Sequence, residues 1–200
     1  GPKNRVPGLA AAGTGVAIGR EVTRFSVGDD VYGVSRGAFA EFAAAPEDKL
    51  VHKPTNLTFE QAAAVPVSAT TAMQAVQLGR IGAGQTVMVI AASGGVGTYA
   101  VQIAKALGAE VTGVTSTRNL DLVRALGADH VIDYTTDDFT ANGQHYDLIL
   151  DNVSNRSLSD LRRVLAPTGV LVPNGGNFGN RWMASGGRIV RAAVLFSFAS

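Results

Sequence analysis

A glycine-rich turn over residues 91–97 has the residue types and the spacing that could bind a ligand. It contains Ala92-x-Gly94-x-x-Gly97, a form of the G-x-G-x-x-G pattern with alanine in the first place. Gly94 would let the backbone approach a pyrophosphate, Gly97 would let a helix and a strand pack closely, and free N–H groups at the helix start would hold the anion. The turn therefore predicts a dinucleotide-binding loop. Its predicted binding residues are Ala92, Ser93, Gly94, Gly95, Val96 and Gly97.

The residues on either side of this turn have the patterns of a buried strand and a helix. Val87–Ile90 form an unbroken apolar run, typical of a parallel strand that is covered on both faces. After the turn, apolar residues recur at helical steps from Val96 to Leu107, and Gly108 is suited to end the helix. A glycine pair alone is often only a flexible turn, but a strand before it and a helix after it favour a binding loop.

Strand and helix patterns alternate after Gly108. Such alternation favours a parallel, doubly wound sheet with right-handed crossovers, which is the Rossmann arrangement, so the predicted fold class is α/β. The predicted strands are 110–114, 130–133, 148–150 and 170–173, and the predicted helices are 119–126 and 157–165.

The first part of the chain is predicted to be rich in β-structure. Val16–Ile18, Val31–Val34 and Ala38–Ala43 are short strand candidates separated by turn residues. Three such strands are too few and too short to bury a core, so they either lean on a second domain or belong to a domain of which part is absent. We therefore expect two domains, at residues 1–55 and 56–200.

Two short helices are predicted between these β-rich residues and the binding loop. Thr58 and Gln61 match the S/T-x-x-E/Q capping box, which opens a helix that Pro66 is expected to close. A second helix is predicted over residues 68–78, with a glycine directly after its end.

The residues after the second Rossmann strand bear on the choice of dinucleotide. In NAD sites an Asp or Glu near this place commonly accepts hydrogen bonds from the ribose 2′-OH. Here the segment 114–119 has no carboxylate but offers hydroxyl groups and the guanidinium of Arg118. These groups would bind a 2′-phosphate through charge-assisted hydrogen bonds, so NADP(H) is predicted over NAD(H). Alternatively, Ser116 and Thr117 only cap the next helix and Arg118 is a solvated surface charge.

Composition excludes several other classes of protein. The 200 residues are 46% hydrophobic and carry a formal net charge of +1, which suits a globular protein and disfavours a nucleic-acid partner. The chain has no cysteine, which excludes disulfides, thiolate metal sites and a cysteine nucleophile. No apolar run reaches the roughly 18–20 residues that span a bilayer, and no signal peptide is evident. We expect no membrane association, with the cytoplasm as the default location.

Six motifs follow one another in register over nearly the whole chain. They are Val6-Pro7-Gly8-Leu9 with Ala12-Gly13, Phe25-x-x-Gly28-Asp29-x-Val31, Gly37-Ala38-Phe39-Ala40-Glu41, Leu57-x-x-Glu60-Gln61-Ala62-Ala63, Ala91 to Gly97, and Leu126-Gly127-Ala128-Asp129-x-Val131-Ile132-Asp133-Tyr134. Their order resembles the zinc-independent quinone oxidoreductase branch, with the zeta-crystallin-like enzymes, of the medium-chain dehydrogenase/reductase superfamily. The resemblance implies a partial GroES-like β-barrel before the Rossmann domain, with the active site in a cleft between them.

The resemblance also implies roles for individual residues. Ser116, Arg118 and Tyr134 would surround the 2′-phosphate of NADP(H), although Tyr134 could instead be a half-buried packing ring. A second group would lie near the ribose and nicotinamide, although its threonine could simply bond its own helix backbone and its glycine pair could form a turn. This second group is Thr71, Asn152, Val153, Gly175 and Gly176.

The chain departs from the zinc-dependent members of that superfamily. Those members carry a Gly-His-Glu motif where this chain has Gly8-Leu9-Ala10, and a cysteine-rich lobe where it has only Val34-Ser35-Arg36. His52, His130 and His145 are scattered without ligand spacing, so no metal is expected. The resemblance further implies that the early barrel and the last Rossmann strand are missing, as in a fragment. We therefore name no catalytic acid, and a homodimer is implied only for the full-length protein.

The lack of zinc ligands narrows the predicted chemistry. Zinc commonly stabilises the alkoxide charge of a reduced ketone, whereas a quinone or enone spreads that charge over a conjugated system that hydrogen-bond donors can stabilise. The sequence is interpreted as an NADPH-dependent reductase of a small, apolar conjugated carbonyl compound. Phe178, Trp182 and residues 189–198 either line its cleft or belong to the core. An enoyl-thioester reductase of the same superfamily and a non-catalytic NADPH-binding protein are the alternatives.

Overall fold

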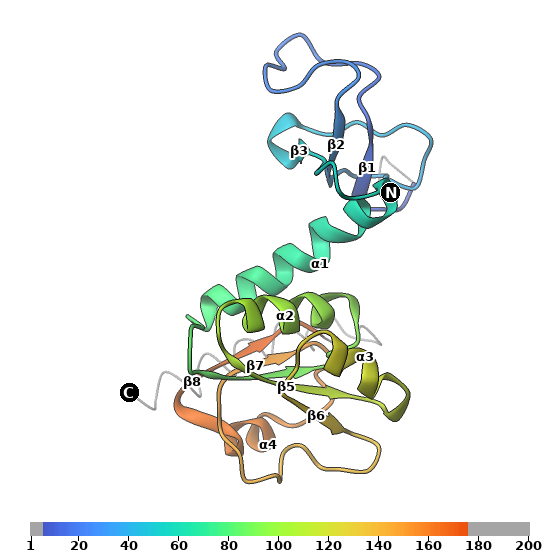
Figure 1. Ribbon diagram of the computed structural model, residues 1–200. Coiled ribbons are helices and arrows are strands. Elements are labelled where there is room, and N and C mark those ends of the chain that lie inside the picture. The colour runs from blue at the N-terminus through green and yellow to red at the C-terminus, as the bar shows by residue number, and fades with distance from the viewer. Residues whose placement is uncertain (1–5, 176–200) are drawn as a thin grey trace. The chain divides into compact units, whose positions relative to one another are not determined.

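The computed structural model describes residues 6–175 and divides between Thr70 and Thr71 into two compact units (Figure 1). We call the residues up to Thr70 unit 1 and those from Thr71 onward unit 2. The predicted domain boundary between residues 55 and 56 lies earlier in the chain, before the helix within which the units divide.

The described part of unit 1 is a small antiparallel sheet with few buried side chains. Its elements are β1 (Ala10–Thr14), β2 (Asp30–Val34), the 3₁₀ turn η1 (Glu47–Lys49) and β3 (Leu50–His52). β2 lies between the other two strands and pairs with both of them. Among the described residues of unit 1, Ala62 and Pro66 are the buried apolar side chains. Three short strands therefore do not enclose a core of their own, as expected.

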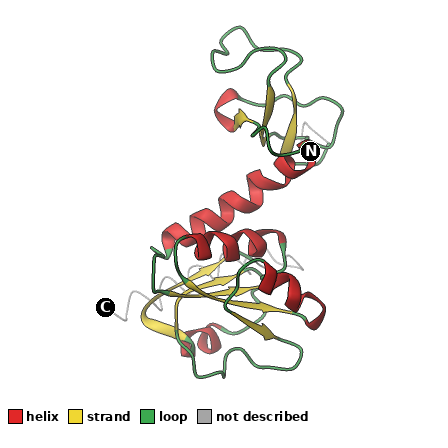
Figure 2. Ribbon diagram, viewed as in Figure 1, coloured by secondary structure: helices red, strands yellow, loops and turns green. Residues whose placement is uncertain are grey.

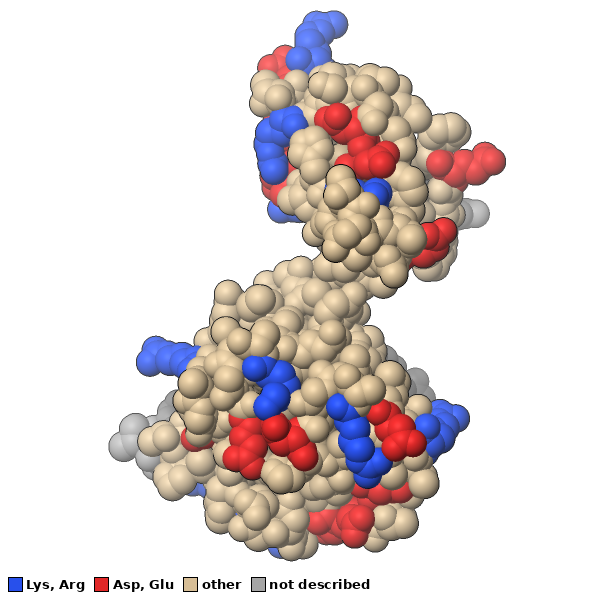
Figure 3. Space-filling view, in the orientation of Figure 1, with Lys and Arg blue, Asp and Glu red and all other residues tan. Residues whose placement is uncertain are grey.

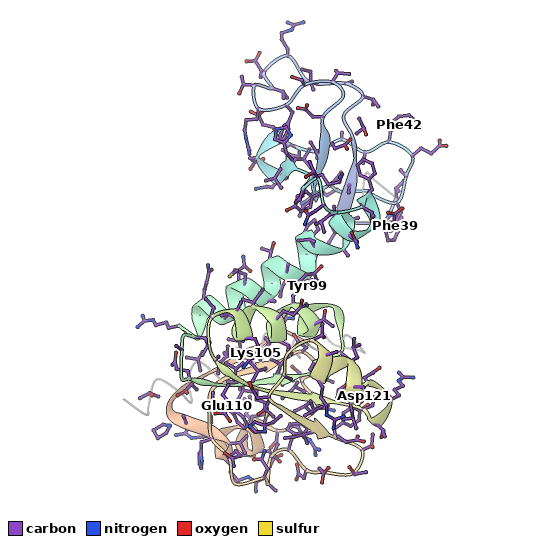
Figure 4. All side chains as sticks on the ribbon, in the orientation of Figure 1. Phe39, Phe42, Tyr99, Lys105, Glu110 and Asp121 are labelled. Atoms are coloured by element: carbon purple, nitrogen blue, oxygen red, sulfur yellow. The ribbon has the colours of Figure 1, made fainter. Side chains whose placement is uncertain are left out.

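Two of the strands predicted for unit 1 are wrong. Val16–Ile18 and Ala38–Ala43 lie in irregular loops. On the second loop, Phe39 and Phe42 are 74% and 73% exposed (Figure 4). An apolar run is not sufficient for a strand, because the strand must also pair with a neighbour, and neither of these segments pairs with the described sheet of β1, β2 and β3. The strand predicted at 31–34 is confirmed as β2.

The helix α1 (Phe59–Leu78) replaces the two short helices that were predicted. Its start has the predicted capping box, because the N–H of Thr58 donates to Gln61 Oε1 at 3.0 Å and the N–H of Gln61 donates to Thr58 Oγ1 at 3.2 Å. Pro66 lies inside the helix, so the predicted break at this residue is wrong. Its missing N–H removes one helical hydrogen bond. The capping box stabilises the first turns, and buried side chains stabilise the last turns.

Unit 2 contains a doubly wound sheet of five parallel strands, which confirms the predicted Rossmann arrangement (Figure 2). In space the strands are ordered β6-β5-β4-β7-β8, so the chain starts at the centre, moves to one edge and then crosses to the other side. The strands are β4 (Thr86–Ile90), β5 (Glu110–Thr115), β6 (His130–Asp133), β7 (Tyr146–Asp151) and β8 (Leu165–Pro173).

Alternate residues of the central strand β4 pack into two apolar clusters on opposite faces of the sheet. The helical elements of unit 2 after β4 are α2 (Gly95–Ala106), η2 (Thr117–Asn119), α3 (Leu120–Ala125) and α4 (Leu158–Arg163). Val87 and Val89 join residues of α1, α2 and α3, whereas Met88 and Ile90 join residues of α4. All four strand side chains are at most 4% exposed, so the apolar run that predicted β4 reflects a strand covered on both faces.

An ion pair links α2 to the residue before β6. Lys105 Nζ lies 2.7 Å and 2.9 Å from the two carboxylate oxygens of Asp129, and the N–H of Val111 donates to the same carboxylate at 2.7 Å. Lys105 is labelled on α2 in Figure 4. The hydrogen bond from Lys105, followed by the one from Val111, holds the pKa of Asp129 below its ordinary value. This carboxylate therefore connects α2, β5 and the start of β6.

We expect Asp129→Asn to lower the free energy of unfolding by about 1 kcal/mol near neutral pH, because partial exposure reduces the value of a charged hydrogen bond. Folding lowers the pKa of Asp129, so its contribution is fully present above its ordinary pKa and is lost as the pH falls through the lowered value. Urea denaturation of both proteins from about pH 7 to about pH 2 measures this. A difference that stayed constant down to the lowest pH would contradict the prediction. Asp121→Asn, whose side chain is 100% exposed, is the control.

Candidate functional site

The carboxyl end of β4 lies where the strand order of the sheet reverses. The chain leaves β4 for β5 on one side and later returns to β7 on the other. In doubly wound sheets, ligands bind outside the carboxyl ends of the strands at such a point. The predicted binding loop, residues 91–97, follows β4 directly and therefore lies at this edge.

The loop ends in a helix start whose N–H groups have no acceptor within the described chain. Gly94 is the N-cap of α2, and it provides no side-chain cap. Among the bonds of residues 6–175, none has the N–H of Gly95, Val96 or Gly97 as donor, whereas the N–H of Thr98 donates to the Gly94 carbonyl at 2.9 Å. Three available donors and the positive end of the helix dipole suit a bound anion.

Gly97 allows α2 to contact the end of β4. A Cβ at this position would stand 2.2 Å from the carbonyl oxygen of Ala91 and 2.8 Å from the backbone of Ala92. Ala91 has a left-handed φ of 59°, which turns the chain out of the strand. Ala92, the first position of the predicted pattern, is 0% exposed and packs in the core beneath the loop. Only a residue without a side chain fits at Gly97.

Ser93 connects the loop to the end of β5. Its Oγ lies 2.8 Å from Oγ1 of Thr115, and Asn119 Nδ2 donates to Ser93 Oγ at 3.1 Å and to Ser116 Oγ at 3.4 Å. The structure thus joins two of the predicted residues, Ser93 and Ser116, in one hydrogen-bonded network. Thr115 and Asn119 also belong to it, but sequence analysis did not single them out because no local pattern marks a contact between two loops.

Arg118 and Tyr134 follow neighbouring strands of the sheet. Arg118 lies in η2, just after β5, where it is exposed and has no hydrogen-bonded or ion-paired partner within residues 6–175. Tyr134 follows β6 directly and is 51% exposed, and its N–H donates to the carbonyl of Thr115 at 3.0 Å. The turn after β5 and the residue after β6 are therefore linked through their backbones, and both predicted side chains are accessible.

A carboxylate also reaches this region from the end of β6. Asp133 is 8% exposed, and its Oδ2 accepts from Thr117 Oγ1 at 2.5 Å. Its Oδ1 accepts from the N–H and the Oγ1 of Thr135 at 2.9 Å and 2.7 Å. These bonds, that from Thr117 first, hold the pKa of Asp133 below its ordinary value. The turn after β5 has no carboxylate of its own, as sequence analysis noted. The carboxylate of Asp133, at the end of β6, nevertheless bonds to Thr117 in that turn.

The predicted residues after β7 and β8 lie beside the end of β4. Asn152 Nδ2 donates to the Ile90 carbonyl at 2.9 Å, and Asn174 Nδ2 donates to Asn152 Oδ1 at 2.8 Å. A Cβ on Gly175 would stand 2.1 Å from the carbonyl oxygen of Asn152, so the two segments are in close contact. Val153 follows Asn152 and is 39% exposed. The predicted residues outside the described part of the chain are Gly176, Phe178, Trp182 and 189–198.

One more predicted residue, Thr71, and one cavity belong to other segments of the chain. Thr71 is partly buried within α1. A cavity of about 380 Å³ opens at the amino ends of the strands, where its lining includes Thr86, Glu110, His130 and Tyr146. Because ligands of doubly wound sheets bind at the carboxyl ends instead, we do not assign the dinucleotide to this cavity.

Metal, membrane and charge features are limited in the described part of the chain. Residues 6–175 contain no group of three or more His, Cys, Asp or Glu side chains that could hold a metal ion. His130 is paired with a single carboxylate, since its Nε2 lies 2.8 Å from Glu110 Oε1. No helix within residues 6–175 is both long and apolar enough to cross a membrane. On the face shown in Figure 3, positive and negative side chains are interspersed. That face therefore presents no continuous basic surface.

Comparison with known protein families and sequences gives consistent similarities. Residues 95–193 match the family described as "Zinc-binding dehydrogenase". A chloroplastic quinone-oxidoreductase homolog of Spinacia oleracea is 38% identical over 181 residues, which cover 84% of this chain and 55% of that protein. A chloroplastic NADPH-dependent alkenal/one oxidoreductase of Arabidopsis thaliana is 34% identical over 194 residues, covering 88% of this chain and 50% of that protein. The chain thus spans about half the length of the curated relatives it matches.

Solved structures share the same architecture. A quinone oxidoreductase from Coxiella burnetii superposes with a TM-score of 0.79 at 29% identity, over 94% of this chain and 59% of that one. A mycobacterial protein complexed with NADPH gives a TM-score of 0.80 at 30% identity, over 96% and 63%. The CurK enoyl reductase gives a TM-score of 0.77 at 28% identity, over 92% and 57%.

We expect Gly97→Ala to lower the free energy of unfolding by about 1–3 kcal/mol, because the added methyl group would meet fixed backbone atoms of Ala91 and Ala92. Chemical denaturation measures the change. Gly82→Ala is the control, since a Cβ there would meet nothing closer than Gln85 Oε1 at 4.0 Å. We expect the control to change the free energy by less than about 0.5 kcal/mol. Equal stability of the two variants would show that α2 does not need glycine at residue 97.

Proposed function

The chain belongs to the quinone oxidoreductase-like branch of the medium-chain dehydrogenase/reductase superfamily, and from this premise we propose that it binds NADPH for the reduction of a conjugated carbonyl compound. Because the chain spans about half of its relatives, the activity of the whole protein is part of this proposal. The proposal includes the dinucleotide site, the preference for NADPH and the class of substrate.

The observation that carries the proposal is the uncapped start of α2 at the reversal point of the sheet. The available N–H groups of Gly95, Val96 and Gly97 suit the pyrophosphate of a dinucleotide. The close contact at Gly97 supports this fit, since a side chain there would fill the space between the helix and the strand. NADPH, when bound, supplies the hydride, and the residues of this chain bind and orient it.

A preference for NADPH is supported by the turn after β5. Arg118 is exposed, makes no bond with another described residue and is therefore available to a 2′-phosphate. Ser116 and Tyr134 directly follow the neighbouring strands β5 and β6. An Arg guanidinium binds phosphate oxygens through strong, charge-assisted hydrogen bonds. An NADPH-dependent relative and a structural neighbour in complex with NADPH support the same choice.

The ribose and nicotinamide are proposed to lie beside the end of β7. Asn152 is fixed by its bond to the Ile90 carbonyl, and Val153 and Gly175 lie in the same pair of segments. Backbone groups held this firmly would orient a ring without a charged side chain. A role for Thr71 in this part of the site stays a prediction.

A quinone or an enone is the substrate class that we propose, without participation of zinc. Such a substrate distributes the charge that follows hydride transfer, so that hydrogen-bond donors are sufficient to stabilise it. The names of the relatives, a quinone-oxidoreductase homolog and an alkenal/one oxidoreductase, support this class. An enoyl-thioester reductase is the second candidate, which the similarity to CurK favours. The two curated relatives named here are chloroplastic, so a cytoplasmic location stays a prediction. The homodimer of the full-length protein also stays a prediction.

We expect NADPH to bind at least tenfold tighter than NADH, which is about 1.4 kcal/mol, and Arg118→Ala to remove most of this difference. The loss should appear in the NADPH dissociation constant, with that of NADH changed less than about twofold. Fluorescence titration of the cofactor measures both constants. Arg80→Ala, which removes an exposed arginine before β4, is the control and should leave the ratio unchanged. Equal binding of the two cofactors by the unaltered protein would rule out the NADPH preference.

Turnover separates the two substrate classes. We expect NADPH oxidation with a simple quinone or an α,β-unsaturated ketone, followed by absorbance at the nicotinamide band, to exceed that with an enoyl thioester by at least about tenfold in kcat/KM. A preference for the thioester would favour the second candidate. NADPH binding without turnover of any of these compounds would contradict the proposed activity while leaving the binding site intact.

A further inference from the structure

We propose that Asp133 is a positioning residue that joins the two sides of the 2′-phosphate pocket, and that the pocket needs its hydrogen bonds rather than its negative charge. This inference rests on the proposed function, because it concerns the NADPH phosphate. It addresses an apparent conflict, since a carboxylate beside a phosphate site should repel the phosphate.

The hydrogen bonds of Asp133 form a closed arrangement across two strand ends. One carboxylate oxygen accepts from Thr117 Oγ1 at 2.5 Å, and the other accepts from the N–H and Oγ1 of Thr135 at 2.9 Å and 2.7 Å. The hydroxyl oxygens of Thr117 and Thr135 are themselves 3.1 Å apart. Each carboxylate oxygen thus has at least one donor, and the group is only 8% exposed.

The bonded residues are adjacent in sequence to two residues of the proposed 2′-phosphate pocket. Thr117 directly precedes Arg118, and Asp133 directly precedes Tyr134. A bond between Thr117 and Asp133 therefore restrains the backbone that carries Arg118 relative to the backbone that carries Tyr134. The bond from the Tyr134 N–H to the carbonyl of Thr115 restrains the same two segments from the other side.

The turn that carries Arg118 depends strongly on such side-chain bonds. The 3₁₀ turn η2 spans only Thr117–Asn119 and has no buried residue, so packing does not fix it. Asn119 bonds it to the pyrophosphate loop through Ser93, and Thr117 bonds it to β6 through Asp133. Removing the second connection would leave Arg118 free to move and would raise the entropic cost of fixing it on a phosphate.

The charge of Asp133 acts in the opposite direction. Its hydrogen-bond donors lower its pKa, so it is ionised at neutral pH and places a negative charge next to the segment that would receive the phosphate. An asparagine at this position would keep the bonds, because its Oδ1 can accept from Thr135 and its Nδ2 can donate to the Thr117 hydroxyl. The two contributions can therefore be separated by substitution.

The test compares the NADPH and NADH dissociation constants of the unaltered protein with those of Asp133→Asn, Asp133→Ala and Thr117→Val. We expect Asp133→Asn to bind NADPH as tightly as the unaltered protein or up to about threefold tighter, since it removes repulsion but keeps the connection. We expect Asp133→Ala to weaken NADPH binding by about three- to tenfold. Thr117→Val should weaken it at least as much, because it breaks the connection and leaves the charge in place.

NADH is the internal reference, because it lacks the phosphate and uses the same pyrophosphate loop. Its dissociation constant should change less than about twofold in all three variants, whereas a general loss of structure would weaken both cofactors. Asp137→Ala is the matched control, because this substitution removes a neighbouring carboxylate that is not bonded to Thr117. The Asp137 carboxylate accepts a hydrogen bond from Thr136 Oγ1 at 2.9 Å. Circular dichroism of each variant verifies that it is folded.

The outcomes separate the two proposals. If the unaltered protein binds NADPH and NADH equally, the proposed NADPH preference fails. If it prefers NADPH and both Asp133→Ala and Thr117→Val keep that preference, the positioning role fails while the proposed function stands. If Asp133→Asn loses the preference as fully as Asp133→Ala, the carboxylate charge is required, and the inference is likewise overturned.

Discussion

The contact between the first turn of α2 and the end of β4 is the constraint on which the rest of unit 2 depends. Gly97 brings the helix to within a van der Waals contact of the Ala91 carbonyl, and the left-handed Ala91 directs the chain into that contact. Gly94, the N-cap of this helix, has no side chain to cap it, so the N–H groups of the helix start stay available. The turn that packs the helix against the sheet is thus the same turn that would bind an anion under the proposed function.

The turn after β5 connects the parts of the candidate site. Through Asn119 it is bonded to Ser93 in the pyrophosphate loop, and through Thr117 it is bonded to Asp133 at the end of β6. The loop that would bind the pyrophosphate and the turn that would bind the 2′-phosphate are therefore one hydrogen-bonded assembly. The exposed Arg118 lies within this turn, between the two residues that make these bonds.

Local chemistry explains which features could be predicted from the sequence. The run Val87–Ile90 predicted a buried parallel strand because its burial on both faces leaves an unbroken apolar pattern, and the residues after it predicted the turn and the helix α2 that the structure has. The binding of a dinucleotide by this turn stays a prediction. The strand predicted at Ala38–Ala43 failed because pairing depends on a neighbour that the local pattern does not reveal. Asp133 and Asn119 were missed for a related reason. Their partners, Thr117 in η2 and Ser93 in the loop after β4, are 16 and 26 residues away in the chain.

The exposed position of η2 bears on how such a protein can evolve. None of its residues is buried, so most substitutions there should leave the fold nearly as stable as before. Gly97, in contrast, is confined by the backbone around it. Under the proposed function, successive lineages could therefore exchange the residues of this turn, and with them the nucleotide pool that supplies the electrons, while the glycine loop stays fixed. A change of metabolic role would then need only a few surface mutations.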